Sequence, residues 1–125
     1  MLSHKELEEY ILSKPGSWLD YPFGEGVAVY KVGSKETAKM FALIKDGSEP
    51  VQVSLKCDPV LAEQLREQYA TVMPGYHLNK KLWNTIIVSG EMEQEYLLSL
   101  VDLSYRLVVE GLTKDERGRL GFVGF

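Results

Sequence analysis

Residues 27–55 read VAVYKVGSKETAKMFALIKDGSEPVQVSL, and the pattern of this stretch indicates the architecture of the domain. It contains three short apolar runs, at 27–32, 39–44 and 51–55, and glycine-containing turns separate them. Such runs predict β-strands, and strands joined by short turns pair in antiparallel order. The third run alternates apolar and polar residues, which predicts a sheet with one apolar face.

Helices are expected before and after these strands. Ser3 and Glu6 have the spacing of a capping box, which predicts a helix that begins at about residue 4. Asp58-Pro59 predicts the start of a second helix, with the aspartate as N-cap and the proline at the first helical position. The long amphipathic segment at 93–110 predicts a third helix.

Two more strands are expected at 74–78 and 83–88, while 18–26 should form an ordered loop. The order α-βββ-α-ββ-α predicts a two-layer α+β domain with a five-stranded antiparallel sheet. The helices should cover one face of this sheet and leave the other face partly open to solvent. The domain should span residues 1–112, and residues 113–125 should form a C-terminal tail that is frayed by default. The apolar residues of this tail could instead pack on the domain or on a neighbour: Leu120, Phe122, Val123 and Phe125.

The composition is that of an ordinary globular domain, with 45% hydrophobic and 26% charged residues in a chain of 125. No apolar run approaches the roughly 20 residues that a membrane-spanning helix needs. The N-terminal segment lacks the apolar block of a signal peptide. Cys57 is the single cysteine, so no internal disulfide can form, as is usual in a reducing compartment. We therefore expect a cytoplasmic monomer that does not contact a membrane.

The charge is distributed unevenly along the chain. The total is −4, which argues against a dedicated high-affinity nucleic-acid binder. Residues 27–57 carry five lysines and three acids, and residues 71–90 carry two lysines and no acid. These two positive segments coincide with the expected strands, whereas the expected helices are acidic. The pattern predicts a basic sheet face and an acidic helical face.

The stretch Pro74–Thr85, PGYHLNKKLWNT, is the most specific of four motifs that occur in order along the chain. The others are Asp20–Gly24 (DYPFG), Lys31–Gly33 (KVG) and Lys56–Pro59 (KCDP). Together they resemble the MmcQ/YjbR family of small bacterial proteins over residues 3–112. This resemblance implies a fold similar to bacterial secretion chaperones and to the frataxin homologue CyaY. It also implies DNA binding through a pair of protruding hairpins, described as a double wing.

The resemblance and the basic hairpin turn together select a set of candidate DNA-contacting residues. The lysines would neutralise phosphates, and the asparagine, histidine and tyrosine would supply polar or stacking contacts. Members of the family often carry a histidine immediately before the tryptophan of the hairpin, where this chain has Leu82. The candidate nucleic-acid-binding residues are Lys80, Lys81, Asn79, His77, Tyr76, Lys31 and Lys39.

Each of these residues also has a purely structural interpretation. Lysines are common at hairpin turns because such turns are solvated, asparagine tolerates the left-handed backbone of a turn, and a hydrogen-bonded histidine can be structural. Trp83 could stack on a base, but a tryptophan that opens a core strand is expected to be a packing anchor. Asn84 is expected to contact backbone rather than base edges, and Cys57 to be a small buried residue.

No enzymatic activity, metal or cofactor is expected. No cysteine or histidine pair has metal-ligand spacing, and Gly24-Glu25-Gly26 precedes a strand, whereas a dinucleotide-binding loop must follow one. The leading hypothesis is weak, largely non-specific DNA binding through the basic hairpins. The alternative is a chaperone-like module that binds another protein and has no nucleic-acid role, because fold analogy alone does not decide between the two.

Overall fold

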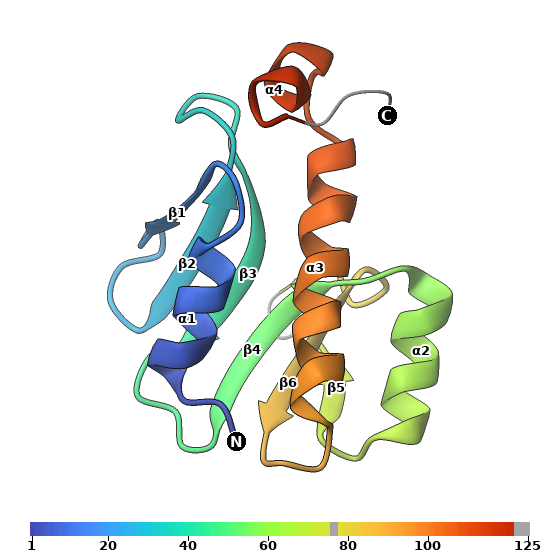
Figure 1. The fold of residues 1–125 in the computed structure, drawn as a ribbon. Helices are drawn as coiled ribbons and strands as arrows, with labels where there is room; N and C mark the ends of the chain where they lie inside the picture. The colour runs from blue at the N-terminus through green and yellow to red at the C-terminus, as the bar shows by residue number, and fades with distance from the viewer. Residues whose placement is uncertain (76–77, 122–125) are drawn as a thin grey trace.

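The computed structural model describes residues 1–75 and 78–121, which form a two-layer α+β domain (Figure 1). Its helices are α1 (His4–Leu12), α2 (Pro59–Gln68), α3 (Gln94–Glu110) and α4 (Lys114–Arg119), and its strands are β1 (Ser17–Asp20), β2 (Val27–Val32), β3 (Lys39–Lys45), β4 (Val51–Lys56), β5 (Val72–Pro74) and β6 (Trp83–Val88).

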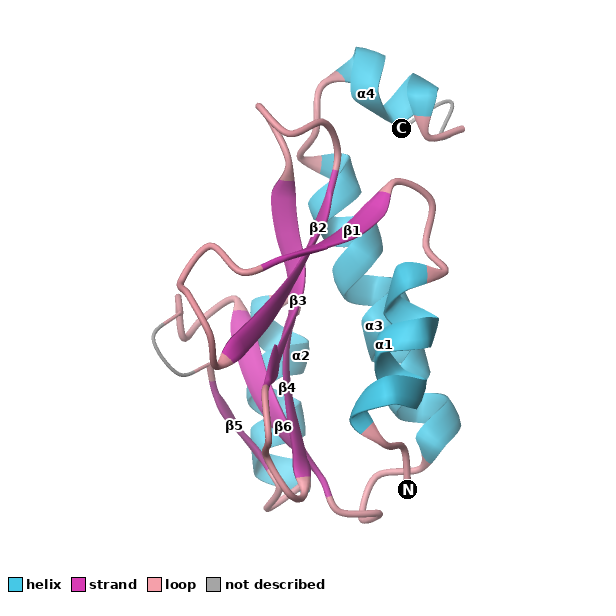
Figure 2. Cartoon of the chain, turned by 90° about the vertical axis from the view of Figure 1, so that its left-hand side faces the viewer, coloured by secondary structure: helices cyan, strands magenta, loops and turns pink. Residues whose placement is uncertain are grey.

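The sheet has the strand order β1-β2-β3-β4-β6-β5, and every neighbouring pair is antiparallel. Helices α1 and α3 lie against one face, and the opposite face, which we call the open face, carries no helix in the described chain (Figure 2). The α+β class and the antiparallel sheet are thus confirmed. Strand β5 forms one edge of the sheet, and α2 lies beside β5 and β6 at that edge (Figure 1).

The sheet has six strands, not the expected five, because β1 occupies part of the segment expected to be a loop. Trp18 pairs with Lys31 across β1 and β2, and its indole Nε1 donates to the carbonyl of Gly33 at 3.0 Å. A four-residue edge strand is too short to show a hydrophobic period. Strand β5 also ends at Pro74 instead of beginning there, and one further hydrogen bond follows it, from the N–H of Gly75 to the carbonyl of Trp83 at 2.8 Å.

A β-bulge in β3 decides which side chains reach each face. The pairing shifts between Tyr30 and Lys31, so that β3 contains one extra residue, Phe41, opposite β2. Without the bulge, Lys39 and Lys45 would lie on the same face because their numbers differ by six. With it, Lys39 lies beside the helices and Lys45 lies on the open face.

The main core lies between the sheet and the helices. Ser104 of α3 is buried there, and its Oγ donates to the carbonyl of Phe41 at 2.6 Å and accepts from the backbone N–H of Lys56 at 2.8 Å. This hydroxyl joins α3 to β3 and β4. The expected inward residues of the long helix are all buried: Leu97, Leu100, Val101, Ser104 and Val108.

A smaller cluster on the open face contains Val29, Leu43 and Trp83, all buried. Trp83 is 7% exposed, which confirms that it packs. It lies on the open face, opposite α3, and therefore outside the main core. Consecutive strand residues point to opposite faces, and it is Asn84 that faces the helices.

The C-terminal segment continues beyond residue 112 as α4, which Thr113 caps through a hydrogen bond from the N–H of Glu116. Leu120 packs against the main core. Residues 122–125 of the expected tail lie outside the described residues. In the part of the chain that the structure describes, no helix is long and apolar enough to cross a membrane.

Candidate nucleic-acid interface

The loop between β5 and β6 carries the lysine pair, and Asn79 organises its turn. The carbonyl of Asn79 accepts from the N–H of Leu82 at 3.1 Å and from that of Trp83 at 2.9 Å. Its side-chain Oδ1 accepts from the N–H of Lys81 at 3.0 Å. The Asn79 carboxamide oxygen therefore holds the turn, which matches the structural interpretation of this residue.

Arg66 of α2 connects this loop to the body of the protein. Its Nη1 donates to the carbonyl of Lys80 at 3.2 Å and to Oδ1 of Asn84 at 2.7 Å. Nδ2 of Asn84 donates in turn to the carbonyl of Ala62 at 3.2 Å. Asn84 thus makes the backbone contact expected of it. The sequence analysis missed Arg66, because no local spacing links residue 66 to residues 80 and 84.

Lys80 and Lys81 both have exposed side chains. No ion pair joins either ammonium group to any residue that the structure describes. The backbone under these lysines is held by Asn79 and Arg66, so two positive charges are presented from an ordered turn. This geometry suits contact with an anionic surface.

Lys31 lies on the open face but is already neutralised. Its Nζ lies 2.8 Å from Oδ2 of Asp20 and 5.5 Å from the centre of the Trp18 ring. The hydrogen bond from Lys31 lowers the pKa of the Asp20 carboxyl below its ordinary value. Asp20 is therefore an acidic residue among the lysines of this face, and the expected separation of charge between the two faces is incomplete.

Lys39 points the other way. It pairs with Val32 of the main core, and its Nζ donates to the carbonyl of Gly111, just after α3, at 3.0 Å. A cation at a helix C-terminus is favourable, which gives Lys39 a structural role.

The seven candidate residues therefore do not form one site. The structure brings Lys80, Lys81 and Asn79 together, places Lys31 on the same face in an ion pair, and separates Lys39 from them. Tyr76 and His77 lie outside the described residues.

Two further lysines reach the open face. Lys45 is the cross-strand neighbour of Val27, and Lys56 is that of Trp83. Acidic side chains are concentrated instead on the helices, as expected. The helical acids are Glu6, Glu8, Glu9, Glu63, Glu67, Glu95, Asp102, Glu110, Asp115 and Glu116.

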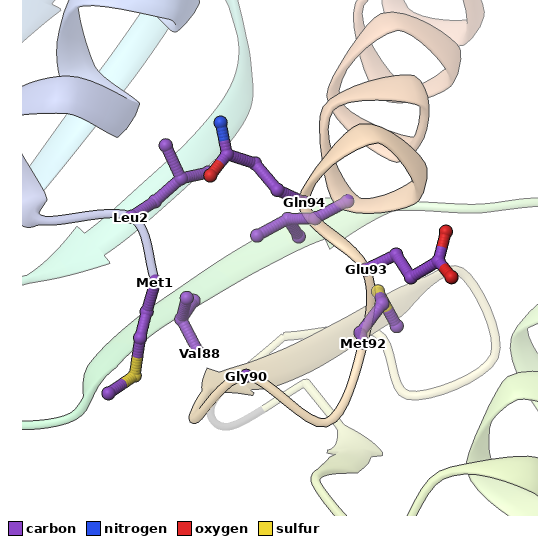
Figure 3. A pocket seen from close by; sticks show the side chains of 8 residues that line it. Met1, Leu2, Val88, Gly90, Met92, Glu93 and Gln94 are labelled. Carbon is purple, nitrogen blue, oxygen red and sulfur yellow. The ribbon is translucent and has the colours of Figure 1, made fainter.

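No group of three histidine, cysteine, aspartate or glutamate side chains among the described residues could hold a metal ion. Burial, followed by the neighbouring Asp58, raises the pKa of the Cys57 thiol to about 11, so this buried cysteine is a protonated thiol at neutral pH. A hollow of about 170 Å³ lies near the N-terminus of α3, but mostly apolar side chains line it and the Glu93 carboxylate points away from it (Figure 3).

The similarity of this chain to known proteins extends over most of its length. The family model YjbR matches residues 12–107. The uncharacterized protein YjbR of Escherichia coli K12 is 35% identical over 112 residues, which cover 90% of this chain and 92% of the relative. The uncharacterized protein YyaQ of Bacillus subtilis is 24% identical over 117 residues, with coverage of 86% and 98%.

Solved structures of related proteins share the fold of this chain. The crystal structure of the Deinococcus radiodurans protein DR2400 has a TM-score of 0.91 and 38% identity, and the match covers 97% of this chain and 89% of that one. A Pseudomonas syringae protein has a TM-score of 0.72 at 24% identity, over 86% of this chain and 99% of its own, and shows the shared fold alone.

Proposed function

This chain belongs to the YjbR family, and we propose that it binds duplex DNA weakly, largely without sequence preference, through the loop between β5 and β6. The observation that carries the proposal is the exposed Lys80-Lys81 dipeptide, which forms no ion pair with any described residue and lies on a turn held by Asn79 and Arg66. Each lysine that neutralises a phosphate releases condensed counterions, and this gain does not depend on base sequence.

The surroundings of the loop support the same function. The described part of this loop and the loop 21–26 both project on the side away from α1 and α3 (Figure 2). Lys45 and Lys56 add positive charge to that face, and the acids of α1 and α3 lie on the opposite side of the sheet (Figure 2). A polyanion that approaches the open face therefore meets Lys45, Lys56, Lys80 and Lys81, although the Asp20 carboxylate also lies on this face, paired with Lys31.

The net charge of −4 limits the affinity. Exposed charges are screened beyond about 8 Å at physiological ionic strength, so the local lysine contacts and the long-range repulsion both weaken as salt rises. Contact at a protruding loop wins at low ionic strength, because counterion release is then most favourable. We therefore expect measurable binding at about 50 mM salt and little binding at physiological salt.

Fluorescence anisotropy with a labelled duplex, titrated at several salt concentrations, tests this function. Replacing both Lys80 and Lys81 with alanine should flatten the log–log salt dependence by about 2, with similar weakening for different DNA sequences. The control is Lys5→Ala with Lys114→Ala, which removes the same charge from two exposed helical positions and should keep the slope.

Two outcomes contradict the proposal. The first is no binding by the wild-type chain at about 50 mM salt, at protein concentrations that saturate weak non-specific binders. The second is an equal salt slope for the Lys80/Lys81 variant and the wild type. Either result would leave binding to another protein as the better explanation of the domain.

A further inference from the structure

The open face carries a groove of about 710 Å³ between the loop 21–26 and the described part of the β5–β6 loop. Strands β2, β3, β4, β5 and β6 all contribute to it. Its apolar lining comes from Phe23, Val27, Leu43, Met73 and Leu78. Lys80 and Lys81 are not part of the lining, so variants at these two lysines distinguish the groove from the proposed DNA contact on the same face.

Two of the apolar side chains are unusually open to solvent. Phe23 is 66% exposed and Met73 is 38% exposed, and they line the same groove from opposite ends of the sheet. Covering apolar surface is favourable by roughly 25 cal/mol per Å². A ligand with an apolar body would therefore gain free energy by lying between these two side chains.

The two hydroxyl groups on the floor of the groove are hydrogen-bonded to each other. Ser54 Oγ and Thr85 Oγ1 lie 2.8 Å apart and hydrogen-bond to each other across β4 and β6. Gln52, on the same face of β4 as Ser54, also lines the groove. Because the hydroxyls are already paired, an apolar group can cover them with little loss of hydrogen bonding to water.

Lys45 gives the groove a positive charge. Among the described residues of the lining, it alone carries a charge, and it forms no ion pair with any described residue. The β3 bulge is what places it on this face. Glu25, in the nearby loop, is exposed and does not belong to the lining. One end of the groove is therefore electropositive, and the rest is apolar.

We propose that this groove binds a small amphipathic carboxylate, with its apolar body between Phe23 and Met73 and its carboxylate at Lys45. The volume lies within the range of roughly 300–1,000 Å³ that is typical of small-molecule sites. The groove is bounded by loops on two sides, which suits a compact ligand better than the broad, flat surface that protein partners require.

Isothermal titration calorimetry with dodecanoate tests the proposal, and dodecyltrimethylammonium serves as a probe with the same tail and the opposite charge. Dodecanoate should bind at one site, and the cationic probe at least tenfold more weakly. Lys45→Met should weaken dodecanoate about five- to tenfold, the effect of one partly exposed charge-assisted hydrogen bond. The matched control is Lys39→Met, on the same strand but the opposite face, which should bind dodecanoate like the wild type.

A blocking variant locates the site. Met73→Trp adds bulk at an exposed position of an edge strand, so it should abolish dodecanoate binding while the thermal melting curve stays cooperative. The Lys80/Lys81 double alanine variant should bind dodecanoate normally, which separates this site from the DNA contact.

Three results would overturn the proposal: no dodecanoate binding at 1 mM, unchanged binding by Lys45→Met, or unchanged binding by Met73→Trp. Self-association of the wild type that Met73→Trp relieves, measured by analytical ultracentrifugation, would assign the groove to an interface between copies and would equally overturn it.

Discussion

Nη1 of Arg66 lies 2.7 Å from Oδ1 of Asn84, and the same nitrogen reaches the carbonyl of Lys80 at 3.2 Å. The guanidinium of α2 thereby joins a buried amide on β6 to the tip of the neighbouring loop. Asn84 is 2% exposed, so its carboxamide depends on protein partners rather than water. The position of the lysine pair is in this way linked to the packing of α2 on the sheet.

Arg66→Met should destabilise the protein by about 1–3 kcal/mol, because it leaves the buried Asn84 oxygen without its donor. It should also weaken DNA binding by loosening the turn. Urea denaturation measures the first effect and anisotropy the second. Arg106→Met is the matched control, since Arg106 is exposed on α3 and, among the described residues, its one ion pair is with Glu110 at 3.9 Å. Equal stability of the two variants would show that the Arg66 bridge contributes little.

Trp83→Ala should cost about 3–5 kcal/mol, as truncation of a large buried aromatic residue does. The indole packs with Val29 and Leu43 under the described part of the β5–β6 loop. Differential scanning calorimetry gives the change, and Trp83→Phe should recover much of the loss because it keeps an aromatic ring in the cluster. An unchanged melting temperature for Trp83→Ala would refute the packing role and favour base stacking.

Gly75→Ala should destabilise the protein by about 1–3 kcal/mol through overpacking. A Cβ at residue 75 would lie 2.7 Å from Cβ of Trp83 and 3.2 Å from its carbonyl oxygen, and neither atom belongs to a flexible chain end. Gly118→Ala is the contrasting variant, because nothing lies within 4 Å of its Cβ and α4 gains helix propensity of up to about 1 kcal/mol. Chemical denaturation should show a lower midpoint for Gly75→Ala and a higher midpoint for Gly118→Ala. Shifts of the same sign in both variants would contradict the prediction.

The sequence predicted those parts of the fold that have a periodic or capped pattern. The strands at 27–32, 39–45 and 51–56 and the long helix each present a repeating apolar pattern, and Asp58-Pro59 caps α2 as expected. Strand β1 was not predicted, because it is an edge strand of four residues whose register is set by its pairing with β2. No local pattern encodes that pairing.

The site was harder to predict than the fold for a related reason. The lysine pair and its turn residue Asn79 are contiguous, so the sequence located them. The faces of Lys39 and Lys45 depend on a bulge that is visible in the pairing and not in the composition. The role of Arg66 depends on α2 lying next to β6, which tertiary packing alone establishes.

Asp20→Asn should strengthen DNA binding and steepen its salt dependence by about 0.9, because it releases Lys31 to contact a phosphate. The matched control is Asp102→Asn, which removes the same charge from the helical face, where Asp102 pairs with Lys14. Both variants raise the net charge equally, so long-range attraction changes equally and the difference between them reports the freed lysine.

The pH dependence gives an independent check of the same relationship. The hydrogen bond from Lys31 lowers the pKa of Asp20, so the pair persists above the ordinary aspartate pKa of about 4 and is lost as the pH falls through the lowered value. Between pH 5 and 8 the pair is intact, and the excess affinity of Asp20→Asn over the wild type should stay constant there. If Asp20→Asn and Asp102→Asn gave the same salt slope as the wild type throughout this range, Lys31 would lie outside the DNA contact and the basic surface would be confined to the Lys80-Lys81 turn.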